Sequence, residues 1–293
     1  MATPDGREAF EKILNVRDVG QHINHLSNQE LLQSGLLFRG ARPDAATPSD
    51  RQRLVKELGI KTVLDLRTPT EHVEQARKHA ADIPSAPALT PSDPAEPLRI
   101  AEIEYCDVNL NGSGYMNALI WQLSYFQMAQ LFGLYAFGWR KEAISVLGQN
   151  VMAERGLSGL AIDTLVHCKR ELKEVFDVLC DASAHPVLVH CTQGKDRTGL
   201  VVLLVLLLCD VPRKAIDADY RMSESELAPE REEKVAEIRS IGLPDSFADC
   251  PGDWVETVCK YIDEACGVVE EYLESCGVGA EQQAKLKNAL KVP

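Results

Sequence analysis

The stretch Val187–Leu208, VLVHCTQGKDRTGLVVLLVLLL, decides the fold of this chain. Its first residues, with Pro186 before them, form a short apolar run that predicts a buried strand. The run 199–208 is longer and predicts a core helix, because it is too short to span a bilayer. A polar, glycine-containing loop connects the two. A loop that leads from a strand into a helix N-terminus can aim several backbone N–H groups at one anion, so the stretch predicts an anion site.

Further strands and helices are expected on both sides of this unit. Short apolar runs predict strands at 35–39, 61–66 and 103–108, and residues 186–190 form the fourth. Residues 49–58 predict a helix capped by Ser49 or Asp50, and the amphipathic spacing of 157–179 predicts one long helix. From Pro212 onward the pattern is helical, whereas the five prolines of 83–98 predict a loop. Strands that alternate with helices indicate an α/β sheet.

The length and composition suit one domain. With 293 residues and 45% hydrophobic composition, the chain can bury a sizeable core. We expect a single domain over residues 1–293, with a helical insertion or lid at 109–155 and a helical C-terminal part at 212–293.

Residues 109–139 are unusual because none of them is charged. Eight of the chain's 17 aromatic residues lie between Tyr115 and Trp139. Three interpretations are open: a buried helix pair, a hydrophobic lid or substrate-facing insertion, and a membrane span. Interrupting Gln and Ser residues and the lack of a flanking basic cluster disfavour the span.

The net charge and the cysteine pattern disfavour several classes of protein. The formal net charge of −13, without a basic stripe, speaks against nucleic acid as a partner and against stable membrane insertion. Nine cysteines without a CxxC pair predict neither a disulfide framework nor a zinc site. The polar start MATPDGREAFEK does not resemble a signal peptide, so we expect a reducing, cytoplasmic setting.

The loop itself carries the chemistry. Cys191 opens it and Arg197 closes it, a spacing that can wrap one tetrahedral dianion with inward N–H groups and a bidentate guanidinium. The same positive field favours the thiolate, which is the nucleophilic form of cysteine. A thiolate can attack phosphorus and form a phosphocysteine intermediate, while Arg197 and the amides stabilise the developing charge. We expect no metal and no cofactor. A nucleotide-binding P-loop is excluded, because Asp196 follows Gly194-Lys195 where Ser or Thr is required.

His190-Cys191-x5-Arg197-Thr198-Gly199 resembles the signature of the protein tyrosine phosphatase superfamily. The fuller HCTQGKDRTG is similar to the loop of its tyrosine/serine, or atypical dual-specificity, branch. The segments NVRDVG (15–20), LLFRGARP (36–43), LGIKTVLDLR (58–67) and DADYRMSE (217–224) resemble further parts of that branch and occur in the same order. The resemblance implies a three-layer α/β fold with a small, mostly parallel central sheet. It does not extend to residues 109–155.

The resemblance also implies roles for the loop residues. Cys191 is the nucleophile, Arg197 the phosphate clamp, and Thr198 the hydroxyl that assists departure of the thiolate. Lys195 is the basic loop residue also found in phosphoinositide phosphatases, and Asp196 a general acid within the loop. The chain departs from the family pattern in three places: Gln193 where a small residue is common, Gln21 where a glycine is expected, and no WPD-type acid motif.

The remaining site residues have expected supporting roles. Thr192, Gln193, Gly194 and Gly199 complete the phosphate loop and its packing. We expect His190 to orient that loop, although it could be an ordinary strand-end residue. Because a leaving group needs an acid within hydrogen-bond reach, Asp65 and Asp107 are alternatives to Asp196. Asp65 and Arg67 could equally form a structural ion pair.

The predicted function is a cysteine-dependent phosphatase acting on phosphotyrosine or mixed phosphoprotein substrates. An alternative is a phosphatase of phosphoinositides or hydrophobic small-molecule phosphates, which Lys195 and the aromatic segment favour. A different class, an inactive phosphate-binding module, is disfavoured because both Cys191 and Arg197 are present. Redox sensing by Cys191 is compatible with activity, since exposed thiolates are oxidisable.

Overall fold

A five-stranded sheet forms the centre of the molecule. The computed structural model describes residues 9–82 and 98–292. The strands are β1 (Arg17–Asp18), β2 (Leu37–Gly40), β3 (Thr62–Asp65), β4 (Glu104–Asp107) and β5 (Val187–His190). Their order is β1-β2-β5-β3-β4, and every neighbouring pair is parallel except β1 with β2. The predicted α/β architecture and the four predicted strands are therefore confirmed.

The sheet has a separate apolar core on each face, which gives three layers. Successive side chains of a strand point to opposite faces. Accordingly, Val187 and Val189 belong to the larger core, whereas Leu188 belongs to the smaller one. The larger core contains most of α9 (Asp196–Leu208), a helix with ten buried residues. The run 199–208 is thus the core helix that its composition predicts.

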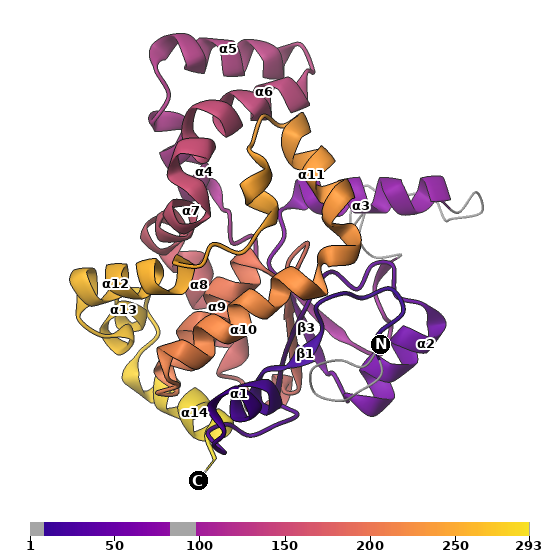
Figure 1. Ribbon diagram of the computed structural model, residues 1–293, viewed down its shortest axis with the longest axis vertical. Helices are drawn as coiled ribbons and strands as arrows, with labels where there is room; N and C mark the ends of the chain where they lie inside the picture. The colour runs from indigo at the N-terminus through magenta and orange to yellow at the C-terminus, as the bar shows by residue number, and fades with distance from the viewer. Residues whose placement is uncertain (1–8, 83–97, 293) are drawn as a thin grey trace.

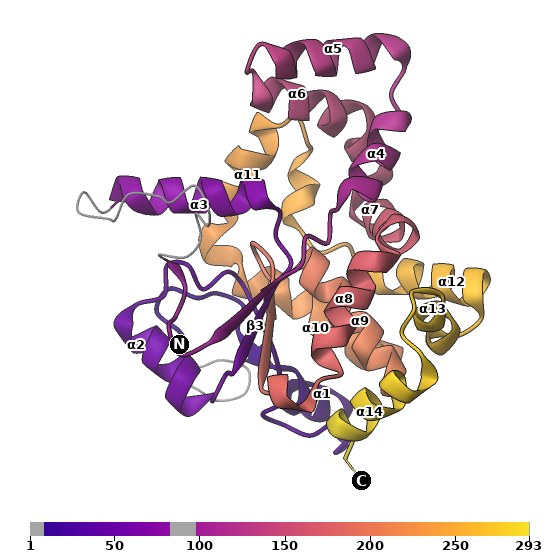
Figure 2. The same ribbon diagram turned by 180° about the vertical axis from the view of Figure 1, so that it is seen from behind.

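Helices cover both faces and one end of the sheet (Figure 1, Figure 2). Besides α9 they are α1 (Val19–Ser27), α2 (Pro48–Gln52), α3 (Pro69–Asp82), α4 (Ser113–Trp121), α5 (Tyr125–Ala136), α6 (Arg140–Leu147), α7 (Ala153–His167), α8 (Lys169–Leu179), α10 (Arg213–Glu226), α11 (Arg231–Ser240), α12 (Trp254–Cys266), α13 (Val269–Ser275) and α14 (Ala280–Leu290).

Two predicted helices differ in detail from the observed ones. The first begins after Thr47, not at Ser49 or Asp50: Thr47 caps α2, and Asp50 completes a reciprocal capping box. It continues as a π-helical turn, Arg53–Glu57. The stretch 157–179 forms two helices, because Cys168 has non-helical backbone angles and separates α7 from α8. Both helices keep helical apolar spacing, so periodicity alone does not reveal the break.

The uncharged segment forms α4 and α5, and α5 with α6 makes a hairpin that projects at the top of Figure 1. Its aromatic side chains are not a buried pair: Tyr115 is buried, but the other seven are exposed. Within residues 9–82 and 98–292, no helix combines the length and apolarity needed to cross a membrane. The loop expected at 83–98 lies almost wholly outside the described residues.

Candidate active site

Cys191 directly follows the central strand β5. It is buried, and α9 begins five residues later at Asp196. The neighbours of β5 bring two other segments to the same edge, because His190 lies opposite Gly40 of β2 and Asp65 of β3. In a parallel sheet the carboxyl ends of adjacent strands meet at one edge, which is where such folds place their ligands.

The loop after Cys191 is held from outside through its carbonyl groups. Asn15 Nδ2 donates to the carbonyl oxygens of Gln193, at 3.0 Å, and Gly194, at 3.1 Å. Arg39 Nη2 donates to the Gly194 carbonyl at 2.7 Å. In a planar trans peptide the N–H points away from the C=O, so the N–H groups of Gly194 and Lys195 point away from these anchors. The loop can therefore present amides on its other side.

Gly194 is required by two features of this loop. Its φ of +66° lies in the left-handed region that other residues disfavour. In addition, a β-carbon there would lie 2.0 Å from the carbonyl oxygen of Gly40. Gly199 allows close packing in the same way, since an added β-carbon would lie 3.1 Å from the Tyr220 ring.

A buried carboxylate neutralises the arginines that support the loop. Asp219 of α10 accepts from Arg17 Nε at 2.7 Å and from Arg39 Nη1 at 2.6 Å, and all three side chains are almost inaccessible. Burial opposes ionisation of Asp219, but Arg17 and Arg39 more than compensate and hold its pKa well below the usual range. The segments NVRDVG, LLFRGARP and DADYRMSE each contribute to this network.

Arg197 lies in the cavity with Cys191 and pairs with a residue that sequence reasoning missed. Its two Nη atoms donate to the carboxylate of Glu71, at 2.8 and 2.6 Å, and Nη1 also donates to the Leu66 carbonyl at 3.2 Å. The Thr192 hydroxyl contacts the same carboxylate. Burial opposes ionisation of Glu71, yet Arg197 keeps its pKa well below the usual range. Glu71 is thus an anion at the edge of the loop.

A sequence signal for Glu71 existed, although it did not reveal the contact. Thr68 and Glu71 form a reciprocal capping box at the start of α3, with the Thr68 N–H donating to Glu71 at 2.9 Å. The pattern T-x-x-E places Glu71 in the first turn of a helix. Its pairing with Arg197, 126 positions away, depends on the tertiary structure.

The side chain of Lys195 does not line the cavity, although its ammonium group lies 3.7 Å from the carboxylate of Asp196, which does. Its buried amino group donates to the carbonyl oxygens of Phe247, at 3.0 Å, and Asp249, at 2.7 Å. It therefore anchors the loop to the segment before α12. A phosphate in the loop would meet the backbone N–H of Lys195, not its ammonium group.

The three candidate acids lie in different surroundings. Asp196 lines the cavity, and Tyr220 donates to it at 3.5 Å. Asp65 is buried and bound by Arg67 at 2.6 Å, while Arg67 also pairs with Asp44. Burial opposes ionisation of Asp65, but His190 and Arg67 lower its pKa to about 2. The structure thus places Asp65 and Arg67 in an ion-pair network.

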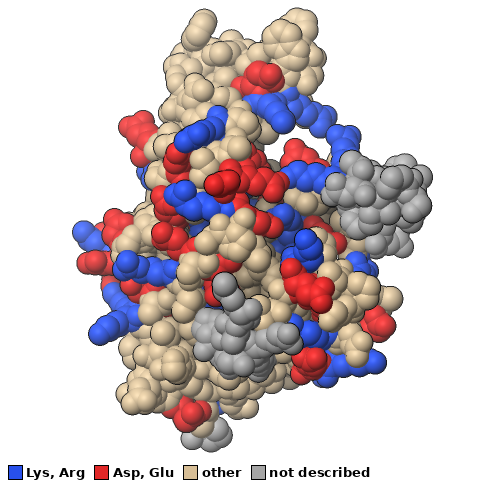
Figure 3. All heavy atoms as spheres, turned by 45° about the vertical axis from the view of Figure 1, so that its right-hand side comes forward, with Lys and Arg blue, Asp and Glu red and all other residues tan. Residues whose placement is uncertain are grey.

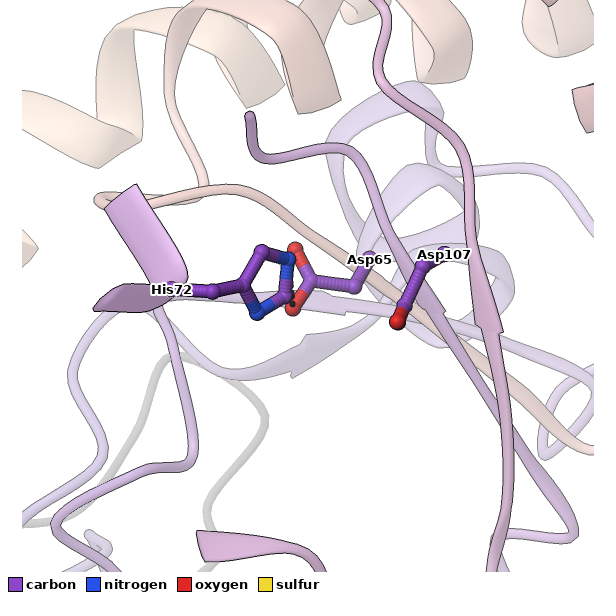
Figure 4. A group of neighbouring side chains, drawn as sticks. All are labelled: Asp65, His72 and Asp107. Atoms are coloured by element: carbon purple, nitrogen blue, oxygen red, sulfur yellow. Dashed lines mark ion pairs between the residues drawn. The ribbon is translucent and has the colours of Figure 1, made fainter. Parts of the chain in front are cut away.

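Asp107 is the last residue of β4, and it lies opposite Asp65 of the neighbouring strand β3. It forms an ion pair with Arg99. Figure 4 shows Asp65 facing the ring of His72, with Asp107 nearby; the ligand atoms of these three residues lie within 4.8 Å of one another. Such a group could hold a cation in principle. Its two carboxylates are, however, already the counter-ions of Arg67 and Arg99.

His190 and Thr198 flank the loop in the sequence, and both are buried. His190 is fully buried, and its Nδ1 donates to the Cys191 carbonyl at 3.0 Å. Burial lowers the pKa of His190, which favours the neutral ring. The buried Thr198 hydroxyl has no hydrogen-bond partner within the described parts of the chain.

The loop forms one end of a cavity of about 240 Å³. Cys191, Thr192, Gln193, Asp196 and Arg197 line that end. The walls are largely apolar and come from α4, α7, α11 and the segments around α12, with Tyr115, Met152, Leu157, Leu160, Ile238, Ile241, Leu243, Phe247 and Trp254. Acidic and basic side chains of α3 and α11 surround the opening, among them Glu74, Lys78, Lys234 and Glu237.

Known proteins resemble this chain in sequence. It is 32% identical over 141 residues to a triple specificity protein phosphatase, PtpB, of Mycobacterium tuberculosis, which covers 42% of this chain and 49% of that protein. It is 30% identical to a tyrosine-protein phosphatase of Nostoc commune, covering 43% and 46%. A Cupriavidus necator protein, named provisionally as a tyrosine-protein phosphatase, is 24% identical over 93% of this chain and 85% of its own length. The first two alignments thus span about half of those relatives.

The match to a protein family covers far more of the chain than the alignments with the Mycobacterium and Nostoc proteins. Residues 9–292 match the tyrosine phosphatase family as a whole, which includes the phosphate-loop region and every strand of the sheet. The resemblance inferred from the loop is therefore confirmed, and this chain belongs to the tyrosine phosphatase family.

Proposed function

We propose that this protein hydrolyses phosphomonoesters with Cys191 as the nucleophile. The observation that carries the proposal is that Cys191, Arg197 and Asp196 line one cavity, next to the carboxyl end of the parallel strand β5. Family membership supports a cysteine-dependent phosphatase, and the relatives named as phosphatases agree with it.

The reaction would proceed in two displacements. The Cys191 thiolate attacks phosphorus in line, the bond to the leaving oxygen breaks, and that oxygen takes a proton from a general acid. Water then attacks the phosphocysteine and gives a proton to the carboxylate that acted as the acid, the S–P bond breaks, and inorganic phosphate leaves with the thiolate restored. Arg197 and the loop amides stabilise the charge on the equatorial oxygens in both steps. No metal is needed for either displacement.

Asp196 is the proposed general acid. Of Asp196, Asp65 and Asp107, it is the one that lines the cavity with Cys191. Asp65 is committed to Arg67, and its low pKa keeps it ionised and unable to donate a proton near neutral pH. Asp107 pairs with Arg99 on β4.

Phosphotyrosine or mixed phosphoprotein substrates are the first candidates, as the family name suggests. The apolar walls favour a second candidate class, namely hydrophobic phosphates such as phospholipids or aromatic small molecules. A cytoplasmic setting and a single catalytic domain remain part of the proposal, and nucleic acid is not an expected partner.

A substrate panel with three variants tests this proposal. Cys191→Ser should lose turnover but still bind vanadate, because a serine hydroxyl is not ionised at neutral pH. Wild-type activity should persist in a chelator. Asp196→Asn should slow substrates with poor leaving groups more than activated aryl phosphates, whereas Asp107→Asn should not discriminate. Hydrolysis of an aryl phosphate by Cys191→Ser would overturn the nucleophile, and equal slowing by Asp196→Asn would overturn the acid.

A further inference from the structure

The hairpin of α5 and α6, with the end of α4, exposes a cluster of aromatic side chains that we name the aromatic tip. Its members are Trp121, Tyr125, Phe126, Phe132, Tyr135, Phe137 and Trp139. Tyr125 is 89% exposed, Phe137 81%, Phe126 80% and Trp121 76%. Soluble surfaces tolerate single exposed apolar residues, but seven exposed aromatic side chains between Trp121 and Trp139 indicate an interaction site.

The two faces of α5 show that the exposed aromatics are not part of the core. Leu131 is buried and Leu134 is partly buried against the core cluster. Tyr125 and Phe132 lie on the opposite side of the helix, and Ala129 and Ala136 share that exposed side. The hairpin is therefore already packed on its inner side, and its outer side is apolar as well.

Charged residues are absent from α4 and α5, but α6 begins with Arg140, Lys141 and Glu142. Residues 109–139 contain no Asp, Glu, Lys or Arg, although the whole chain carries a net charge of −13. On the face drawn in Figure 3, the outermost part of the end that carries α5 and α6 shows no charged side chain, and charged side chains begin just below it. Arg140 and Lys141 follow the tip directly and are exposed.

We propose that the aromatic tip docks on the interfacial region of a lipid bilayer with neutral, zwitterionic headgroups. Trp and Tyr favour that region because their rings are apolar and their N–H and O–H groups remain hydrated. A helix with an exposed apolar face can lie in this region without crossing the bilayer. The net negative charge disfavours anionic lipid, so apolar contact drives the docking.

A lipid surface fits the tip better than a second copy of the chain. Protein interfaces combine an apolar centre with a rim of charged and polar groups that determines register. Residues 109–139, which contain every residue of the tip, carry no charged side chain, and the hairpin projects from the body of the molecule (Figure 2). The charged residues beside the tip belong to the first turn of α6, where the Arg140 guanidinium lies over the Tyr135 ring. A projecting apolar element can enter a fluid bilayer without a partner of matching shape.

The tip shares helices with the catalytic cavity. Tyr115, in the first turn of α4, lines the cavity, and Trp121 ends the same helix within the tip. Docking would therefore hold the cavity at a defined distance from the bilayer. The inference concerns this surface alone and does not depend on the proposed catalysis, so Cys191→Ser protein should dock equally well.

Flotation with phosphatidylcholine vesicles tests whether the protein docks. Tryptophan fluorescence then shows which part of the protein contacts the lipid. Trp121 and Trp139 belong to the tip, whereas Trp254 is buried in the core. With dibrominated phosphatidylcholine, we expect the tip tryptophans to be quenched and the residual emission to come from Trp254. Addition of phosphatidylserine should weaken binding, and high salt should remove that weakening.

Phe126→Ser combined with Phe137→Ser is the informative variant. Both side chains are about four-fifths exposed, so the fold loses little, and the activity of the variant on a soluble aryl phosphate should match that of wild type. Vesicle binding should fall by at least about tenfold, because each buried phenyl ring contributes about that factor or more. Val268→Ser, which removes an exposed apolar side chain outside the tip, is the matched control and should bind normally.

Several outcomes would overturn the proposal. Wild-type protein that stays with the aqueous fraction, equal binding by the double variant, or binding that requires phosphatidylserine would each contradict it. A concentration-dependent dimer that the double variant loses, without vesicle binding by wild type, would assign the tip to a second copy instead.

Discussion

Asp219→Asn should destabilise this protein far more than an equivalent change at the surface. Asparagine has the shape of aspartate but no charge, and its amide donor would face the guanidinium of Arg17 or Arg39. Both arginines are almost fully buried, so each would keep its charge without a full counter-ion. Removing one partner of a buried ion pair costs about 3–5 kcal/mol. That is a large part of the roughly 5–15 kcal/mol that stabilises a typical domain.

Asp263→Asn is the matched control for this prediction. Asp263 binds Arg213 through two hydrogen bonds of 2.7 and 2.8 Å, a geometry close to that of Asp219, but the two side chains are 42% and 53% exposed. Exposed pairs contribute about 0–1 kcal/mol. The difference between the two variants therefore measures burial and not hydrogen-bond geometry.

Urea unfolding followed by circular dichroism is the assay. With a slope of about 3 kcal/mol per molar urea, Asp219→Asn should lower the midpoint by about 1–1.7 M, and Asp263→Asn by less than about 0.3 M. Because the pKa of Asp219 is depressed by folding, its contribution is present above about pH 4 and declines as the pH falls further. The gap between wild type and Asp219→Asn should shrink there. Equal midpoint shifts for the two variants at neutral pH would refute the reasoning.

Three further predictions concern the loop and its supports. Gly194→Ala should lower kcat/KM by about 100-fold, because the added β-carbon would collide with the Gly40 carbonyl. Gly35→Ala is the control: Gly35 also has a positive φ, but open space surrounds it, so this variant should keep full activity. Glu71→Gln should bind vanadate about 3–10-fold more tightly, because the substitution removes the negative charge that pairs with Arg197. A vanadate titration measures this change. Unchanged or weaker binding would show that Glu71 instead holds Arg197 in place. Asp65 has a pKa of about 2 in place of 3.8, so its contribution to stability is lost between about pH 4 and 2. Asp65→Asn should therefore make the free energy of unfolding less dependent on pH in that range. An unchanged pH dependence would contradict the low pKa of Asp65.

Much of the fold was predictable because it is encoded locally. Apolar runs located β2, β3, β4 and β5 within about two residues, and the run 199–208 located α9. The segments that carry the family resemblance also contain members of the buried network, since NVRDVG holds Asn15 and Arg17 and DADYRMSE holds Asp219, but the sequence did not predict that network. What these residues contact was not predictable, since Arg39 and Asp219 are 180 positions apart.

The directions of side chains could not be predicted either, because they also depend on contacts with distant segments. Lys195 lies within the phosphate loop, but the carbonyls that bind it, those of Phe247 and Asp249, come from a segment more than 50 positions away. Periodicity also missed the break at Cys168, because the apolar spacing continues in α8. Likewise, the aromatic composition of 109–139 could not show whether those side chains are buried, since burial depends on what packs against each helix face.

The sequence by itself determined the parallel strand that ends at His190, the loop from Cys191 to Arg197 that is proposed to bind phosphate, and the core helix that follows, because these depend on neighbouring residues and short periodicities. Only the tertiary structure decided which carboxylate pairs with Arg197, where the ammonium of Lys195 points, and that the aromatic residues face outward. Those features depend on contacts between segments far apart in the chain, and no local pattern records such contacts.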